Sequence, residues 1–163
     1  MNRDIVIADT SGLLAALNRN DPAHADARKA LDAASYVIVS PLVLTELDHL
    51  LRRNVKRAAP AGTAPAVLRR MVGEVTREAL GWVVAQAGTG RFGLPETGRE
   101  TLQTAHAVMA RYADRALDLA DAVNVALALE YQTDCLLTLD ERDFRAMPPL
   151  TAHVAFRLLP ADG

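Results

Sequence analysis

The sequence predicts an α/β sandwich in which helices flank a central, mainly parallel sheet. Short apolar runs without polar alternation recur along the chain and are separated by helical patterns, as in folds built from strand–helix–strand units. The length of 163 residues suits one domain, predicted to span 1–163. Half of the residues are hydrophobic and only 4% are aromatic, which favours helices packed closely through small side chains.

The first half of the chain predicts strands and helices in alternation. The apolar run from Asp4 to Asp9 is typical of a buried strand. The cluster Asp9-Thr10-Ser11 at its end suits a helix N-cap, so we expect a helix from there that turns Leu13 inward. The next elements expected are a helix over 23–34 that begins near a proline, a strand over 36–39 and a helix over 42–56.

The second half begins with a linker. Residues 58–65 are rich in Pro, Gly and Ala, which predicts an exposed elbow between two helices. A helical pattern resumes over 67–85, although Gly73 and Gly81 lower its helix propensity. The remaining elements expected are an edge strand at 91–94, helices over 97–112 and 117–131, a strand over 135–139, a short turn through 144 and a strand over 154–158.

The charge is distributed unevenly. The net charge of −2 argues at first against a nucleic-acid partner. Between Arg52 and Arg77, however, seven cations stand against the single acid Glu74, which leaves −8 on the rest of the chain because +6 − 8 = −2. This basic segment could be an ordinary solvated helix face or a surface that meets phosphates.

Several classes of protein are excluded or disfavoured. No apolar run approaches the roughly 20 residues of a membrane span, and the start Met1–Asp4 has no signal-peptide pattern. The single cysteine, Cys135, cannot form an internal disulfide and is expected in the core. The histidines lack zinc spacing, and no phosphate-binding loop or dinucleotide fingerprint occurs. These features predict a cytoplasmic protein.

Four acids stand at positions where solubility does not require them. Asp9 and Asp140 each follow an apolar strand, and ligands of parallel α/β sheets bind beyond the carboxyl ends of the strands. Glu46 and Asp121 lie inside apolar helical segments. Each acid alone has a structural explanation as a cap, an exposed helix residue or a first-turn acid. Together they would suit a hard divalent cation, because clustered carboxylates repel one another without one. Spacing alone does not show that they converge.

Four motifs carry a family resemblance. They are Ile7-Ala8-Asp9-Thr10-Ser11-Gly12-Leu13-Leu14, Ser40-Pro41-Leu42-Val43-Leu44-Thr45-Glu46-Leu47, Leu119-Ala120-Asp121-Ala122-Val123-Asn124 and Leu136-Leu137-Thr138-Leu139-Asp140-Glu141-Arg142-Asp143-Phe144. In this order, and with an acid in each, they make the chain from about Ile5 to Phe156 resemble a PIN domain. More narrowly, it is similar to the VapC-type ribonuclease toxins of bacterial toxin–antitoxin pairs.

The resemblance implies a three-layer sandwich and a metal centre at the carboxyl edge of its sheet. Asp9, Glu46, Asp121 and Asp140 fall on the family's acidic positions, which bind Mg²⁺ or Mn²⁺. Ser11 and Thr138 fall on its hydroxyl positions. Two neighbouring acids are not assigned to the site: Asp118 is expected to begin a helix and Asp143 to be a surface turn residue. Asn124 is not assigned to it either.

The resemblance also implies partners. Family members form homodimers and are held by an antitoxin, and apolar positions on the helices over 43–51 and 67–84 suit such contacts. The chain is longer than typical members, with extra residues around 58–65 and 78–87. The predicted contacts to the RNA backbone are Arg52, Arg53, Lys56 and Arg57.

The leading hypothesis is therefore a Mg²⁺-dependent endoribonuclease toxin that cuts tRNA or rRNA and arrests translation. Asp9 and Asp121 would hold the principal ion, while Glu46 and Asp140 would complete the site or orient the attacking water. One alternative is a non-catalytic PIN-fold module that binds RNA or protein, against which the four acids argue. Another is a phosphotransfer domain, such as a haloacid-dehalogenase-like phosphatase or a response receiver. The phosphatase is disfavoured because Asp9-Thr10-Ser11 lacks a second aspartate two residues on, and the receiver because no acidic pair precedes the end of the first strand.

Overall fold

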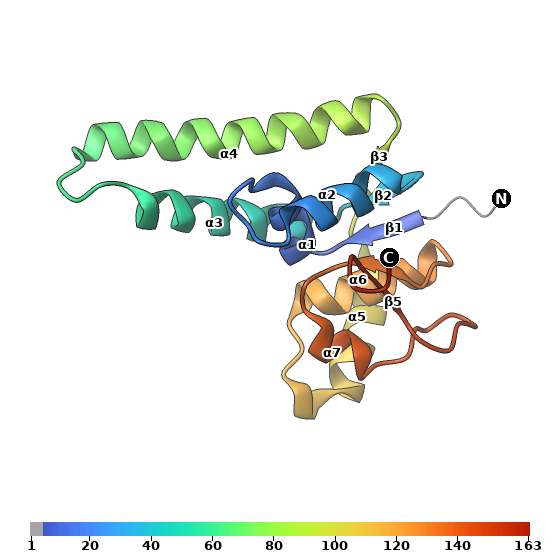
Figure 1. The fold of residues 1–163 in the computed structure, drawn as a ribbon. Helices are drawn as coiled ribbons and strands as arrows, with labels where there is room; N and C mark the ends of the chain where they lie inside the picture. Colours follow the sequence, from blue (N-terminus) through green and yellow to red (C-terminus); the bar gives the residue numbers. More distant parts are fainter. Residues whose placement is uncertain (1–4) are drawn as a thin grey trace.

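The computed structural model describes residues 5–163 and confirms the expected α/β class (Figure 1). Its sheet has the order β3-β2-β1-β4-β5, and each pair of neighbouring strands is parallel. The sheet of the described residues is thus entirely, not mainly, parallel. The strands are β1 (Ile5–Ala8), β2 (Tyr36–Ile38), β3 (Phe92–Gly93), β4 (Cys135–Leu137) and β5 (Arg157–Leu159).

The helices lie close to the expected ranges. They are α1 (Thr10–Leu17), α2 (His24–Ala33), α3 (Pro41–Ala58), α4 (Pro65–Gly88), α5 (Arg99–Arg111), α6 (Leu119–Glu130) and α7 (Glu141–Arg145), with a 3₁₀ turn η1 (Ala113–Arg115).

Two expectations need correction, and one lies partly outside the described residues. The helix expected over 67–85 is confirmed as α4, which continues unbroken through Gly73 and Gly81 and packs against α3. The expected turn after Asp140 is the short helix α7, and the last strand begins at Arg157 rather than 154. The expected first strand included Asp4, which the structure does not describe.

Alternate strand residues supply two cores, one on each face of the sheet. Val6, Val37 and Leu137 belong to one core, and their neighbours Ile7, Ile38 and Leu136 belong to the other. Helices α1–α4 contribute buried residues to the first core, and α5–α7 contribute to the second. This arrangement gives the expected three layers, and the strands are continuous apolar runs because both of their faces are buried.

Local sequence fixes where the two acid-bearing helices begin. α3 starts at Pro41, and the Ser40 hydroxyl accepts a hydrogen bond from the Val43 amide at 3.2 Å. α6 is capped by Asp118, whose carboxylate accepts from the Asp121 amide at 2.9 Å. Such caps satisfy amides that lack partners at a helix start. Asp118 is therefore the helix-start acid that the sequence predicts.

α7 is short but firmly held. Phe144 on this helix is 1% exposed. The Arg145 guanidinium donates to both carboxylate oxygens of Asp162 at 2.8 and 2.7 Å, which ties α7 to the C-terminal turn. This paired geometry orients a guanidinium more strictly than a single contact does. The two anchors fix the helix that carries Asp143.

α3 and α4 run side by side as an arm that projects from the rest of the fold (Figure 1). Residues 59–64 join them at its tip. The cations of the basic segment are exposed, and all lie on the tip-ward half of their helix except Arg77, which lies near the middle of α4; the others are Arg52, Arg53, Lys56, Arg57, Arg69 and Arg70. Within residues 5–163, no helix combines the length and apolarity that crossing a bilayer requires.

Candidate metal centre

The strand order creates a switch point between β1 and β4. From β1 the chain moves outward through β2 to β3 and then returns to β4 on the other side of β1. The amide of Asp9 donates to the Leu137 carbonyl at 2.9 Å, so the ends of these two strands stay joined. In parallel α/β sheets, ligands bind at such a point, beyond the carboxyl ends of the strands. Asp9 and Asp140 both lie there.

Three donors hold the Asp9 carboxylate, which is 5% exposed. Its Oδ2 accepts from the hydroxyls of Ser11 and Thr138, each at 2.8 Å, and its Oδ1 accepts from the Asn124 amide at 3.1 Å. The two predicted hydroxyl residues are thus brought to Asp9, together with Asn124, which is not among the predicted site residues. Hydrogen bonds to a charged acceptor are among the stronger ones, so these donors fix the orientation of the carboxylate.

Glu46 reaches the same region from α3. Its Oε2 accepts from the Thr10 hydroxyl at 2.6 Å. Burial raises the pKa of Glu46 above its ordinary value, the carboxylates of Asp118 and Asp9 raise it further, and the Thr10 hydrogen bond opposes the change. Glu46 is therefore a proton acceptor with increased basicity, held in place by a neighbouring hydroxyl.

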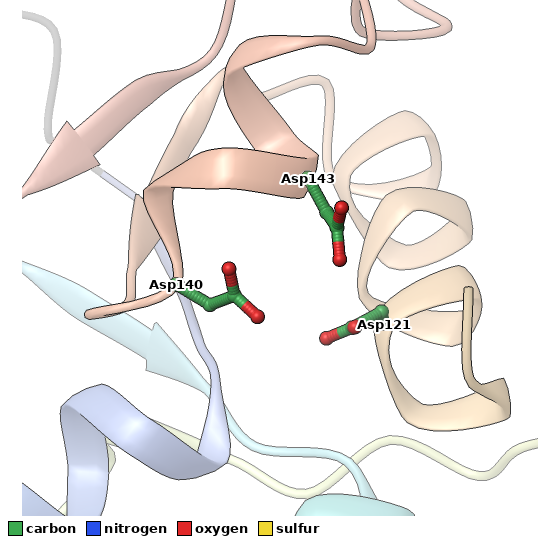
Figure 2. Close-up of side chains that lie close together, drawn as sticks. All are labelled: Asp121, Asp140 and Asp143. Carbon is green, nitrogen blue, oxygen red and sulfur yellow. The ribbon is translucent and has the colours of Figure 1, made fainter. Parts of the chain in front are cut away.

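Asp121 lies close to Asp140 and to Asp143, the residue expected to be a surface turn residue. Figure 2 shows the three side chains turned toward a common space between α6 and α7. Each offers a carboxylate oxygen within 4.8 Å of those of the other two. Burial is the main cause that raises the pKa of Asp121 to about 8, followed by the charges of Asp9, Asp118, Asp140 and Glu46.

The expectation for Asp143 is wrong, since the residue is 8% exposed. The signal in the sequence was the spacing Asp140-x-x-Asp143, because residues three apart lie on one side of a helix. Asn124 shows the same spacing from Asp121. Its polar side chain is fully buried in an otherwise apolar helix, which requires a polar partner.

The donor set fits a hard divalent cation. All of its members are oxygens, the ligands that Mg²⁺ and Mn²⁺ take in proteins. The buried Oδ1 of Asn124 has no hydrogen-bond partner among the described residues, and the surroundings of Asp121 disfavour the charged form of its carboxyl group. A cation in this region relieves both conditions.

The structure divides the four predicted RNA-contacting cations between two faces of α3. Each residue of an α-helix turns by 100° about the axis. Arg53 follows Glu46 by seven residues and Arg57 follows it by eleven, so each arginine points within about 20° of the direction of Glu46. These two arginines therefore share the face of Glu46. Arg52 donates instead to Asp48 at 2.7 Å and lines the groove between α3 and α4. Lys56 lies about 80° from the Glu46 direction.

Comparison with known proteins agrees with this fold. The family model for the PIN domain matches residues 6–148. The chain is 34% identical over 146 residues to Ribonuclease VapC26 of Mycobacterium tuberculosis, which covers 89% of this chain and 93% of that protein.

A solved structure of the same fold is that of Mycobacterium tuberculosis VapC20, described as a sarcin-ricin loop cleaving toxin. It matches with a TM-score of 0.62 at 19% identity and covers 85% of this chain and 92% of that chain. The phosphotransfer folds considered from the sequence are thereby excluded. With the family model matching residues 6–148 and a relative 34% identical over most of its length, the chain belongs to the PIN domain family.

Proposed function

We propose that this protein is a divalent-metal-dependent endoribonuclease that acts as the toxin of a type II toxin–antitoxin pair. Its substrate would be a structured RNA, tRNA or rRNA, whose cleavage arrests translation. The observation that carries the proposal is the convergence of hard oxygen ligands at the β1–β4 switch point. The 34% identity to a ribonuclease supports the same conclusion.

The proposed ligands of Mg²⁺ or Mn²⁺ are Asp9, Glu46, Asp121 and Asp140. When bound, the ion supplies an acidified water and stabilises charge on the scissile phosphate. The contribution of the chain is to keep the ligands in place before the substrate arrives. Ser11, Thr138 and Asn124 perform this task for Asp9 through their three hydrogen bonds.

Glu46 is proposed to take the proton of the attacking water. Its raised pKa brings it closer to neutral pH, where a general base works most efficiently. The hydrogen bond from Thr10 at 2.6 Å holds Oε2 and leaves Oε1 to reach the ion or the water that the ion would hold. Glu46 also borders a shallow surface pocket that it shares with Thr45, His49 and Leu50. The pocket gives the substrate access to this carboxylate.

The RNA backbone is proposed to follow the face of α3 that starts at Glu46 and passes Arg53 and Arg57. At 1.5 Å per residue, the two arginines lie about 10 and 16 Å from Glu46 along the helix axis. This distance separates cations that attract phosphates from acids that repel them. The contacts would be to phosphates, which carry affinity but no sequence information.

The proposed partners are an antitoxin and a second copy of the chain. Large apolar side chains remain exposed along α4, namely Val67, Val75, Leu80 and Val84, and they support both contacts. A cytoplasmic location follows from an RNA substrate and is consistent with the buried thiol of Cys135. Light scattering at micromolar concentration tests the dimer. Growth arrest on expression without an antitoxin tests the toxin role.

Cleavage of total RNA by the purified protein in Mn²⁺ tests the enzymatic part of the proposal. We expect EDTA to abolish cleavage and Asp9→Asn to abolish it in a protein that still folds. Asp114→Asn, at an exposed acid of η1, is the matched control and should cleave normally. Sequencing the new 5′ ends identifies the RNA and the site. Binding of RNA without cleavage by the wild type would instead favour the non-catalytic module.

A further inference from the structure

Two shallow hollows adjoin on α3 beside the proposed metal centre, and they share Thr45 and Glu46. One extends along α3 to His49 and Leu50, and the other reaches the first residues of α6. We propose that the two hollows form a subsite for one nucleobase of the RNA, next to the phosphate that is cut, and that this subsite selects bases with an exocyclic amino group. This inference rests on the proposed ribonuclease activity and names a feature of its substrate.

Apolar side chains line much of the subsite. Leu42 and Leu50 supply them from α3, and Leu119 and Ala120 supply them from the start of α6. Leu119 is 44% exposed. A base that covers these side chains removes apolar surface from water, which favours binding. Enzymes that act on nucleic acids hold unstacked bases against apolar and aromatic side chains in this way.

Hydrogen bonds within α3 make the polar atoms of the subsite acceptors. The Thr45 hydroxyl donates its single proton to the Pro41 carbonyl at 3.0 Å, so its oxygen accepts from a ligand. His49 Nδ1 lies 3.0 Å from the carbonyl oxygen of Thr45. Because a carbonyl oxygen only accepts, Nδ1 carries the proton, and Nε2 of the neutral ring is an acceptor. The Glu46 carboxylate beside them adds acceptors and no donor.

An exocyclic amino group is the donor that matches these acceptors. It carries two N–H bonds, and adenine, cytosine and guanine each have one, whereas uracil, like thymine, has a carbonyl oxygen instead. Thr45 and His49 are one helical turn apart, where Cβ atoms lie about 5–6 Å from each other, so one amino group can lie between their polar atoms. A base without the group takes water from the acceptors and gives them no partner, so it binds more weakly.

The position of the subsite on α3 favours RNA over a protein partner as its occupant. Leu42, Glu46, His49 and Arg53 follow one another at intervals of three or four residues and therefore share one face of the helix. Along the axis, His49 lies about 4.5 Å beyond Glu46 and about 6 Å before Arg53. A base held at His49 thus has its phosphates between the acids proposed to bind the metal and the first arginine proposed to bind the backbone.

Fluorescence anisotropy with the full-length protein, in EDTA at pH 8, tests the subsite without cleavage. The probes are labelled octamers of adenosine and of purine riboside, whose bases differ only in the amino group. We expect the wild type to bind the adenosine octamer about three- to tenfold more tightly, as one or two hydrogen bonds imply. Thr45→Val and His49→Ala should each bring this ratio toward one. His106→Ala, at an exposed histidine of α5, is the matched control and should keep the wild-type ratio.

Equal affinity of the wild type for the two octamers would overturn the inference and leave the hollows to a protein partner. A ratio that persists in both Thr45→Val and His49→Ala would overturn it too, because the discrimination would then arise elsewhere. Both positions are exposed, and should one variant fail to fold, the other still decides.

The proposed enzyme fails separately from the subsite. Wild-type protein that prefers the adenosine octamer but cuts no RNA refutes the ribonuclease and leaves the base subsite standing. Protein that cuts RNA but binds both octamers equally refutes the subsite alone.

Discussion

Replacement of Asp121 by Asn should make the metal-free protein more stable at neutral pH. The pKa of Asp121 is raised from 3.8 to about 8 by burial and by neighbouring carboxylates. An acid whose folded pKa is raised keeps its proton in the folded state while the unfolded chain releases it. The free energy of unfolding of the wild type should therefore fall as pH rises between about 4 and 8 and level off above pH 8.

The magnitude follows from the same pKa. A proton held only in the folded state changes the free energy of unfolding by at most about 1.4 kcal/mol per pH unit. Summed from the unfolded pKa of Asp121 up to pH 7, the change is about 4 kcal/mol. This is an upper limit, because water screens the partly exposed carboxylate and its neighbours relax. The amide introduced by Asp121→Asn has no proton to release, so that part of the slope disappears in the variant. Asp121→Asn should then be the more stable protein at pH 7, although it is impaired as an enzyme.

Urea unfolding followed by circular dichroism, in EDTA at pH 5, 6, 7 and 8, measures this effect. Asp114→Asn, at an exposed acid, serves as the control and should keep the wild-type slope. Mn²⁺ at about 100 times its dissociation constant should add about 2.7 kcal/mol to the wild type at pH 7, and less to Asp121→Asn. Parallel pH profiles for wild type and Asp121→Asn would refute the reasoning that burial and neighbouring carboxylates raise the pKa of Asp121.

Three further predictions follow from single contacts. Thr10→Val should lower the free energy of unfolding in urea by about 1–3 kcal/mol, because it leaves Glu46 without its hydroxyl partner. It should also move the acid limb of the pH–activity profile to higher pH, because that hydrogen bond lowers the pKa of Glu46. Thr10→Ser keeps the hydroxyl and should have neither effect. Gly12→Ala should lower the free energy of unfolding by at least about 1–3 kcal/mol in thermal unfolding, since its Cβ would lie 2.4 Å from the Leu137 carbonyl oxygen. Gly73→Ala, at a position with open space around it, should not destabilise the protein. Replacing both Arg53 and Arg57 by Ala should reduce the slope of log K against log salt for RNA binding by about one to two units. Arg52→Ala, at the residue paired with Asp48, should change that slope little. If the Arg52→Ala variant and the double variant changed the slope equally, the RNA would bind elsewhere.

Local pattern in the sequence was sufficient for most of the fold. The apolar runs that became β1, β2 and β4 and the helices that follow them were predicted because hydrophobic periodicity is a local property. Caps such as Ser40 and Asp118 marked helix starts for the same reason. The last strand was misplaced because residues 146–156, which precede β5, form no helix or strand and give no periodicity that marks where the strand begins.

The site depended on information of two kinds. The sequence by itself identified Asp9, Glu46, Asp121 and Asp140 as acids in unusual places, and family resemblance, not spacing, grouped them. Only the tertiary structure decided that Asp143 joins the cluster and that Asn124 reaches Asp9, across 115 positions of the chain. The physical reason is that strand order determines which residues meet. Because the chain returns to β4 beside β1, the ends of two strands far apart in sequence become neighbours, and no local pattern encodes that choice.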